Sequence, residues 1–539
     1  MARTPLAPRR RARNVQTKKV INPGKGLNNL VSDNLVDDAE ASDLLNIQYV
    51  EAGAVSKRNG YRQVANSLSN NPRGLGVYTP TSGTRYLVTV DGTTLKYTTS
   101  VTTNFSSATG STFTADNAVT FTQARGLLYI WNGVEGGTTF DGSACARPGT
   151  MPKASFGLFY KSYHWVSGVA GQVNRLYISV ATDASDFTNA ATTLHNSTEV
   201  PGATVFAGTG AAFVDIDKDD GDAITGLATF QDSVIVFKKR SIHQITLDSS
   251  GTPTVVLITR SIGCASHRSI ENVENDVFFL SRQGYFVLGN EPNFFNAVRT
   301  NEVSVRIHPT IDLISEANFS KVSSIFYNNR YYSGIPEGGA TANNVVLTYD
   351  RRFLAWARNE FGAEAWTVYT DSNEVEHLCF TSSDSAKIFE IDNNYSDNGS
   401  AINSYWTSKA YDLGEFDLEK RWVDVTMLFR QISGTVTIQV FTDNDTLAAS
   451  TTVEPSPTGG DMGTITLGLE LLGGNADDQV STTNNTTNIP YRLRISKNSR
   501  TVKLKISNNI NNENFVLLGI NWAFYPFSHF KFPSENKLF

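Results

Sequence analysis

Cysteine, charge and long apolar runs are all scarce in this chain of 539 residues, and each scarcity excludes a class of protein. The three cysteines, Cys145, Cys264 and Cys379, lie more than a hundred residues apart, so no pair has the spacing of a zinc site or a redox motif. We expect them to be buried free thiols. No run of about 18 apolar residues occurs, which excludes a transmembrane helix. The basic N-terminus lacks the apolar segment of a secretory signal, so we expect a soluble protein made in a cytoplasm.

The composition favours an all-β protein. Charged residues make up 18% of the chain and apolar residues 40%, while Asn, Ser and Thr are plentiful and long helical periodicity is hard to find. The net charge of −6 is too weak to indicate a protein that coats nucleic acid. The length predicts two or three domains, unless a closed repeat architecture carries most of the chain.

Residues 1–70 form the first predicted zone, a basic extended arm followed by a hairpin. Residues 1–32 contain no acid, and the first 19 residues carry seven cations and no aromatic residue: Arg3, Arg9, Arg10, Arg11, Arg13, Lys18 and Lys19. Such an arm cannot bury enough apolar surface to fold alone, so we expect it to be disordered or to lie on a partner. Beyond it, Ile47 and Tyr49 alternate with polar residues, Glu51 to Gly53 predict a turn, and Ala54 to Lys57 return as a strand.

Residues 71–400 contain short strand signals separated by Gly, Asn or Asp turns, in groups that recur roughly every 40 to 50 residues. RYLVTVDGTTLKYTT is one group, with an Asp-Gly turn between two strands, and GLLYIWNGVEGGTTFDG is the next. A single blade of a β-propeller leaves apolar faces that only neighbouring blades can cover, so this spacing predicts a degenerate β-propeller of six or seven blades. A stack of β-sandwiches would give similar strand spacing and is the alternative.

Residues 401–539 predict an antiparallel β-sandwich. In YRLRISKNSRTVKLKISNN, strict alternation places Leu and Ile side chains on one face, and on the other face Arg492, Arg494, Lys503 and Lys505. We interpret the charged face as solvated or facing another subunit, in preference to a nucleic-acid groove.

The acidic stretch before residue 224 is the weak candidate for a metal site, with Asp215, Asp217 and Asp219 as its ligands. An EF-hand loop counted from Asp215 would have Asp220 where it needs glycine and Gly226 where it needs glutamate. We therefore interpret the acids as turn residues and expect no metal or cofactor.

The stretch that follows contains an apolar strand and a basic turn. Val234 to Phe237 predict a strand covered on both faces, Lys238 to Ser241 an exposed hairpin tip, and Ile242 to Leu247 the returning strand. No Gly-rich cradle precedes a helix here, so the basic turn is not a phosphate loop.

Catalytic signatures are also lacking. The seven histidines are scattered without a spacing suited to a shared metal, and neither a Gly-x-Ser-x-Gly motif nor the Asp-box turns of propeller sialidases occur. We therefore do not expect an enzyme. Carboxylates brought together from distant loops would still allow a propeller-type glycosidase or carbohydrate-binding protein, which is the alternative function.

Two stretches of the middle zone resemble a recurring unit of propeller proteins from bacteriophage tails. DGDAITGLATFQDSVIVFKKRSIHQI, residues 220–245, has the Asp-Gly-Asp turn, the Ile-Thr-Gly-Leu start and the Phe-Lys-x-x-Ser-Ile turn of that unit. GCASHRSIENVENDVFFLSRQGYFVLG, residues 263–289, looks like the next unit. Residues 26–61 are similar to the N-terminal segment of the same proteins, notably in Gly-Leu-Asn at 26–28, Asp-Leu-Leu-Asn at 43–46 and Lys-Arg-x-Gly-Tyr at 57–61.

The resemblance implies a structural virion protein, the nozzle or hub of a short-tailed phage tail, made in the host cytoplasm. It implies a homo-oligomeric ring, a hexamer, below the portal and adaptor proteins, which anchors tail fibres or a tip. Genomic double-stranded DNA would be retained by the ring and ejected through it with only transient, non-specific contact. The basic arm, with Arg9, Arg10, Arg11, Arg13, Lys18 and Lys19, would contact a protein partner or DNA. The resemblance does not fix which tail position the chain occupies.

Overall fold

The computed structural model describes residues 15–64, 67–188, 192–195, 211–218, 220–247, 253–290, 298–432, 434–453 and 489–526. These residues form nine sheets. The chain divides into two compact units, of which the first comprises Met1–Arg58, Phe353–Ala357 and Ser400–Phe539, and the second Asn59–Arg352 and Arg358–Gly399.

Seven sheets, formed mainly by residues of the second unit, follow one another along the chain as blades. Blade one contains β6 (Leu75–Tyr78), β7 (Tyr86–Asp91), β8 (Thr94–Thr98) and β9 (Ser106–Ser107). Blade two contains β11 (Thr120–Ala124), β12 (Leu127–Trp131), β13 (Thr138–Phe140), β14 (Ala144–Ala146) and β10 (Thr109–Gly110). Blade three contains β15 (Phe156–Tyr160), β16 (Tyr163–Ser167), β17 (Arg175–Ile178), β19 (Ala212–Asp215) and β18 (Thr192–His195).

The next three blades have four antiparallel strands each. Blade four contains β20 (Ile224–Phe230), β21 (Ser233–Lys238), β22 (Ile242–Leu247) and β23 (Pro253–Thr259). Blade five contains β24 (Glu271–Val273), β25 (Asp276–Ser281), β26 (Gly284–Asn290) and β27 (Val298–Glu302). Blade six contains β28 (Ser323–Tyr327), β29 (Arg330–Ile335), β30 (Val345–Asp350) and β31 (Ala355–Asn359). Short helical turns connect them: η2 (His267–Ser269), η3 (Val305–Ile307), α1 (His308–Ile311) and η4 (Glu316–Lys321).

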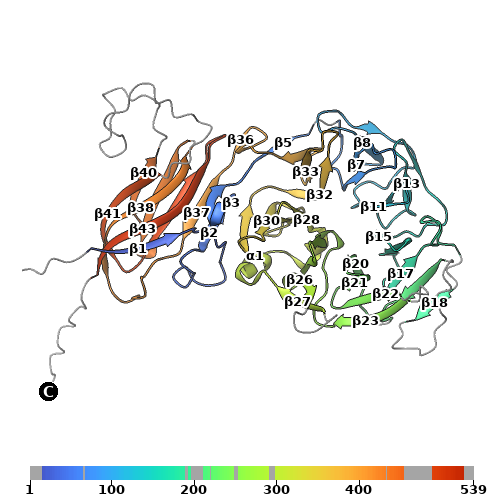
Figure 1. Cartoon of the computed structure of the whole chain (residues 1–539), viewed down its shortest axis with the longest axis horizontal. Coiled ribbons are helices and arrows are strands. Elements are labelled where there is room, and N and C mark those ends of the chain that lie inside the picture. Colours follow the sequence, from blue (N-terminus) through green and yellow to red (C-terminus); the bar gives the residue numbers. More distant parts are fainter. Residues whose placement is uncertain are drawn as a thin grey trace, which may run out of the picture. The chain divides into compact units, whose positions relative to one another are not determined.

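Blade seven closes the ring with a strand from the other end of the unit. It contains β32 (Ala363–Thr370), β33 (Glu376–Ser382), β34 (Ile388–Ile391), β5 (Tyr61–Gln63), β35 (Ser396–Asp397) and β36 (Ser400–Ala401). The first strands of successive blades contact each other, and β32 contacts β6 of blade one, so the sheets surround one axis, as Figure 1 shows. The fold is therefore a β-propeller, and the predicted six or seven blades are seven in the described residues.

Blade four shows why the continuous apolar runs of the sequence fit this architecture. Every side chain of β21 is buried. Val234 and Val236 pack into a core cluster with residues of blade three, while Ile235 and Phe237 pack into a second cluster with residues of blade five. A strand whose two faces both meet a neighbouring sheet needs no polar alternation. The predicted double coverage of this strand is confirmed.

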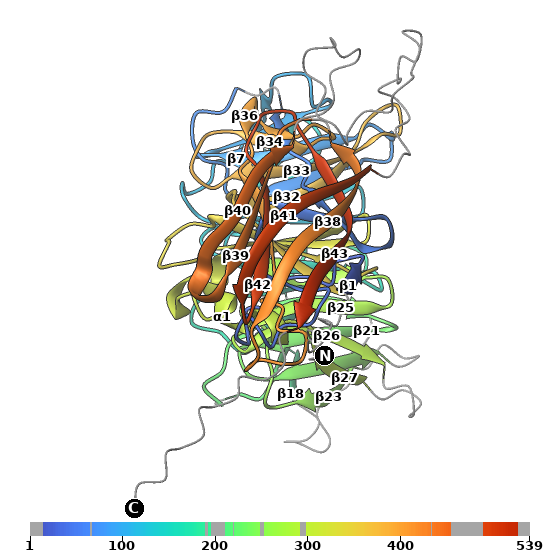
Figure 2. The ribbon, with the colours of Figure 1, turned by 90° about the vertical axis from the view of Figure 1, so that its left-hand side faces the viewer.

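The first unit is built from two antiparallel sheets, which Figure 2 shows. The six-stranded sheet contains β3 (Ile47–Val50), β4 (Ala54–Lys57), β43 (Phe515–Pro526), β38 (Lys420–Ile432) and β41 (Ile489–Ser499), with β1 (Gln16–Ile21) paired to β43. The five-stranded sheet contains β2 (Ala41–Leu45), β37 (Ser404–Ser408), β42 (Val502–Asn508), β39 (Val436–Thr442) and β40 (Thr446–Val453). Two short helical turns, η1 (Glu51–Gly53) and η5 (Asp443–Asp445), join strands.

Aromatic side chains fill the interior of this unit. Trp422 of β38 and Trp522 of β43 are fully buried, with ring centroids 5.8 Å apart. Tyr411, which forms a β-bridge with Val502 of the five-stranded sheet, lies 5.6 Å from the Trp522 ring. The strand alternation predicted around β42 is confirmed, because Val502, Leu504 and Ile506 are buried and the intervening side chains are partly exposed.

The compact units differ from the three predicted zones at the N-terminus. The hairpin over residues 47–57 forms as predicted, but it adds strands to the first unit, whereas β5 adds a strand to the propeller. The reason is that the unpaired backbone N–H and C=O groups at the edge of the hairpin and of β5 need hydrogen-bond partners, which strands far away in the sequence supply.

Candidate functional site

The acidic stretch that sequence analysis singled out lies where blade three leads into blade four. Asp215 ends β19, and both of its carboxylate oxygens accept hydrogen bonds from Arg175, at 2.7 Å from Nε and 2.9 Å from Nη2. This is the bidentate geometry that makes arginine–carboxylate pairs strong. The guanidinium also lies over the Phe213 ring, 3.7 Å from its centroid. The pair raises the pKa of Arg175 through its hydrogen bond to Asp215.

Asp217 lies two residues further along, in the left-handed backbone region with φ 41°. Its Oδ2 lies 3.0 Å from Nε2 of His243 and 3.4 Å from the Arg260 guanidinium. Burial lowers the pKa of His243 more strongly than the nearby carboxylate raises it. Asp219 lies outside the described residues.

The basic turn meets this acidic stretch directly. Lys238 is fully buried, and its Nζ donates to Oδ2 of Asp220 at 2.6 Å and to the carbonyls of Ile216 and Asp217 at 3.1 and 3.3 Å. The predicted exposed tip is therefore wrong at Lys238 and also at Ser241, which is buried, whereas Lys239 and Arg240 between them are exposed as expected. An isolated apolar run followed by cations gives no sign that the first cation will find a carboxylate 18 residues earlier.

Asp222 completes the contact between the two turns. Its carboxylate accepts hydrogen bonds from the backbone N–H groups of Lys239 at 3.1 Å and Arg240 at 2.9 Å. These amides, which would be the donors of an anion site, are thus occupied by the chain itself. The Asp-Gly-Asp turn and the Lys-Lys-Arg turn thus satisfy each other's charges and hydrogen-bonding groups. This is the role of structural residues.

Gly263 joins this arrangement to the next blade. A side chain at this position would place its Cβ only 2.3 Å from the Lys238 carbonyl oxygen, so only glycine allows the backbones to approach so closely. The neighbouring Cys264 N–H donates to the same carbonyl at 2.9 Å. The small residues that begin segment 263–289 therefore pack on the turn that ends at Ser241.

The predicted partner-contact arm is only partly within the described residues. Arg9, Arg10, Arg11 and Arg13 lie outside them. Lys18 and Lys19 lie in β1, which pairs with β43 in the six-stranded sheet. Lys18 forms an ion pair with Asp38 at 2.5 Å, and the side chain of Lys19 is exposed. The last residues of the predicted arm therefore belong to a strand of the first unit.

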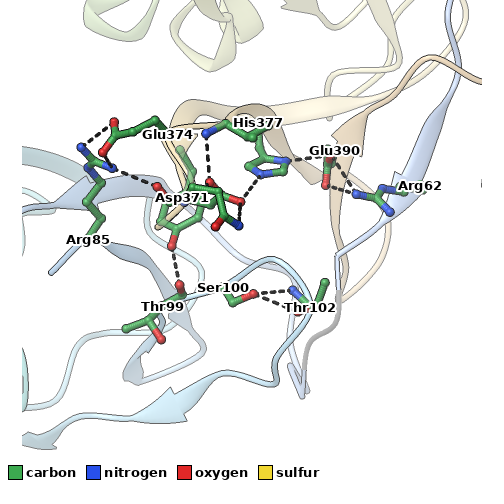
Figure 3. Close-up of polar contacts among 12 residues, drawn as sticks. Arg62, Arg85, Thr99, Ser100, Thr102, Asp371, Glu374, His377 and Glu390 are labelled. Carbon is green, nitrogen blue, oxygen red and sulfur yellow. Dashed lines mark hydrogen bonds and ion pairs between the residues drawn. The ribbon is translucent and has the colours of Figure 1, made fainter.

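A second polar cluster, which sequence analysis missed, lies at the closure of the propeller (Figure 3). Arg62 of β5 donates to Glu390 of β34 at 3.1 Å, and the Oε1 atom of Glu390 lies 2.9 Å from Nδ1 of His377 on β33. Nε2 of His377 lies 3.6 Å from Oδ2 of Asp371. The histidine ring, which is almost completely buried, therefore stands between two carboxylates.

The same cluster extends to blade one. Arg85 forms a bidentate ion pair with Glu374, with both contacts at 2.9 Å, and donates to the backbone carbonyl of Asp371 at 2.9 Å. The Asp371 carboxylate accepts from the backbone N–H groups of Asn373 and Val375, and the latter bond is the main cause that lowers the pKa of Asp371. Each carboxylate in the cluster thus has cationic or amide partners from the protein, and the cluster joins the closing strand, the last blade and the first blade.

The histidine and the carboxylates of this cluster lie within residues 371–390, but their arginine partners come from far away in the chain: Arg62 lies 328 residues before Glu390, and Arg85 lies 289 residues before Glu374. No local signal would have revealed these two pairings. Within the described residues, no group of three or more His, Cys, Asp and Glu side chains is arranged to hold a metal ion. The described part of the chain has no helix that is long and apolar enough to cross a membrane.

The three cysteines are free and buried, as predicted. Desolvation raises the pKa of Cys145 and of Cys264 to about 12, and it raises the pKa of Cys379 still further. A thiol with a raised pKa is a poor nucleophile, because the reactive species is the thiolate. We conclude that the cysteines pack as small apolar residues.

The known proteins that this chain resembles are similar to it in fold only. No protein-family model matches the chain, and no curated protein matches it. Among solved structures, it is similar to the β-propeller domain of Cps50 (Swd1) from Myceliophteria thermophila, with 8% identity, a TM-score of 0.39, and coverage of 62% of this chain and 99% of that one. It is also similar to YCF48 from Cyanidioschyzon merolae, with 7% identity, a TM-score of 0.37, and coverage of 62% of this chain and 98% of that one.

Proposed function

We propose that this chain is a structural subunit of the tail of a short-tailed bacteriophage. Identical copies form a ring, a hexamer, that acts as the tail nozzle or hub, and genomic double-stranded DNA is retained by the ring and ejected through it. The protein is made in the host cytoplasm and works in the virion. It holds its shape and performs no chemistry.

The observation that carries the proposal is what the phage-like residues do. Asp220, Asp222, Lys238 and Gly263 lie in the two segments that resemble phage tail propellers, and they lock blade four to the start of blade five. A buried ion pair with further hydrogen bonds fixes one geometry, because any other arrangement leaves a charge without partners. Residues used in this way favour a rigid scaffold over a pocket for a reaction.

The third phage-like segment serves the same purpose in the first unit. A Cβ on Gly26 would lie 2.8 Å from the backbone nitrogen of Trp356, and the neighbouring Leu27 N–H donates to the Trp356 carbonyl at 2.9 Å. Tyr49 donates to that carbonyl as well, at 2.9 Å. A chain segment near residue 356 is thus held by residues 26–49.

Charge is compatible with a conduit for DNA. The lumen of a DNA conduit should repel the duplex, because a lumen that binds the duplex would stop its passage. A net charge of −6 is more compatible with such repulsion than a net positive charge would be. The arm before β1 is the exception. We propose that it docks on an acidic protein on the portal side, since arms that order on assembly commonly bind partners in this way.

The direct test is electron microscopy of the purified full-length chain under assembly conditions. Closed rings with six-fold symmetry are expected. A monomer that binds or cleaves a polysaccharide would overturn the proposal and favour the carbohydrate-active alternative.

The arm is tested by deleting residues 1–14, which leaves β1 in place. Rings should still form, but attachment to the portal–adaptor complex should be lost. The variant Lys18→Ala is the matched control, because it removes a cation that already pairs within the chain. Unchanged attachment of the deletion variant would reject docking by the arm.

A further inference from the structure

The outer face of the six-stranded sheet combines apolar and basic rows. Ile21 of β1, Gly519 of β43, Leu428 of β38 and Pro490 of β41 lie opposite one another in the strand register. The Ile21 side chain is 57% exposed, which is unusual for isoleucine in a strand. With a glycine between two partly exposed aliphatic side chains, the row forms a shallow apolar strip. Figure 2 shows these four strands side by side.

The next rows of the same face are basic. Two residues along each strand, Lys19, Asn521, Thr426 and Arg492 lie opposite one another, and beyond them Arg494 lies opposite Asp424. Arg492 forms an ion pair with Asp424, yet its side chain is still 70% exposed, while that of Asp424 is 5% exposed. The side chains on the opposite face of these strands, such as Val425, Met427 and Trp522, are buried. We call the exposed set Lys19, Ile21, Leu428, Pro490, Arg492 and Arg494 the docking face.

A loop with the complementary character precedes β38. Residues 412–419 contain four acids and no base: Asp412, Glu415, Asp417 and Glu419. Between them, Phe416 is 74% exposed, more than any other large apolar side chain in the described part of the chain. We call this segment the Phe416 loop.

Lys420 holds the Phe416 loop in one shape. Its side chain is buried, and Nζ donates to the backbone carbonyls of Leu418 at 3.0 Å, Arg500 at 3.2 Å and Glu415. The loop therefore presents Phe416 from a fixed base, at the first residue of β38. An aromatic side chain held in this way loses little conformational entropy when it binds.

The loop cannot reach the apolar strip of its own copy. Leu428 lies eight residues beyond Lys420 in the same strand, which at the rise of a β-strand is about 26 Å. Because a carbonyl of the loop is bonded to Lys420 itself, Phe416 is confined to the start of the strand. A contact between Phe416 and the apolar strip must therefore be made between two copies.

We propose that the Phe416 loop of one copy binds the docking face of a second copy. Phe416 lies against Ile21 and Leu428, and its neighbouring carboxylates pair with Lys19 and Arg492. A buried aromatic anchor with a charged rim is the usual composition of a protein interface. This inference rests on the proposed function, since it names the surfaces by which identical copies associate.

The contact is heterologous, because the two surfaces are different parts of the molecule. Repeated heterologous contacts generate a ring when the rotation closes. Each copy in such a ring gives one Phe416 loop and receives another.

The test uses two full-length variants that each damage one surface. Phe416→Asp damages the loop and Ile21→Asp the docking face, and both positions are exposed, so the folded state should persist with an unchanged melting temperature. Leu35→Asp is the matched control, because Leu35 is 70% exposed in the same unit and lies outside both surfaces. Sedimentation velocity is measured at a concentration at which the wild-type chain is assembled.

The association constant of each damaged variant is expected to be at least tenfold lower than that of the wild type, while the control assembles like the wild type. An equimolar mixture of the two variants retains one intact interface, formed by the loop of Ile21→Asp and the face of Phe416→Asp, so it should give dimers and no rings. The charge reversal Lys19→Glu should weaken assembly, and Glu415→Lys in the same chain should partly restore it.

Two outcomes separate the inference from the proposed function. Wild-type rings together with rings of both damaged variants would overturn this interface and leave the proposed function standing. A wild-type chain that is monomeric at every concentration would overturn both.

Discussion

The buried ion pair between Asp220 and Lys238 gives the sharpest prediction about stability. Asp220→Asn removes one charge and keeps the shape of the side chain. The Lys238 ammonium, which has no exposure to solvent, then loses its counter-charge and is left with neutral partners, among them the carbonyls of Ile216 and Asp217 at 3.1 and 3.3 Å. Leaving one member of a buried pair without its partner costs about 3–5 kcal/mol. Because the Asp220 side chain is 27% exposed, we expect the lower end, about 3 kcal/mol.

Removing the lysine should lower the free energy of unfolding less than removing the carboxylate does. Lys238→Met removes the buried charge together with its need for partners. The remaining Asp220 carboxylate is reached by water and still accepts a hydrogen bond from the Asp222 N–H at 2.9 Å. We expect the free energy of unfolding to fall by about 1 kcal/mol, which is the typical net contribution of one hydrogen bond. In the double variant the loss should be close to that of Lys238→Met alone, which corresponds to a coupling energy of about 2–3 kcal/mol.

The assay is urea unfolding of the full-length chain and the three variants, followed by circular dichroism. Each variant is compared with the wild type in the transition assigned to the propeller, since a chain of two units can unfold in more than one step. Losses that simply add in the double variant, or a loss below about 1 kcal/mol for Asp220→Asn, would refute the argument that the pair is buried and mutually dependent.

Three further predictions follow from the buried groups and the closure. Burial lowers the pKa of His164 to about 4. Between pH 6.5 and pH 4 the unfolded state therefore binds a proton that the folded state does not, and the free energy of unfolding should fall by about 3 kcal/mol. His164→Gln should remove this part of the pH dependence of urea unfolding. Gly60→Ala places a Cβ 1.9 Å from the Ser396 carbonyl oxygen and should lower the melting temperature by several degrees, whereas the control Gly149→Ala, in open space, should not. The buried thiols should react with a thiol reagent only after denaturation; rapid labelling of the native chain would contradict their burial.

Local signals account for what the sequence revealed about the fold. The blades follow from short strands joined by Asp-Gly and Asn-Gly turns, as between β7 and β8, because such turns specify a hairpin within a few residues. The continuous apolar run of β21 indicated a strand covered on both faces, and its packing between blades three and five agrees. The burial of the three cysteines also followed from their chemistry.

Long-range pairing accounts for what the sequence did not reveal. The closing strand β5 joins β34, more than three hundred residues away, and three residues give no signal of their own. The burial of Lys238 depends on a carboxylate in a different turn. The cluster around His377 gains Arg62 because β5 joins blade seven, and it gains Arg85 because blade one meets blade seven. Composition and spacing describe neighbours along the chain, whereas these contacts depend on ring closure.

The most direct test of the account is to locate the protein in the particle. Under the proposed function a phage encodes this chain, so antibody against the purified chain, coupled to gold, is applied to intact virions of that phage and viewed by electron microscopy. We predict label on the tail, at one position below the head, in every particle. Virions that carry no label and no peptide of the chain by mass spectrometry would contradict the claim that it is a structural part of the tail.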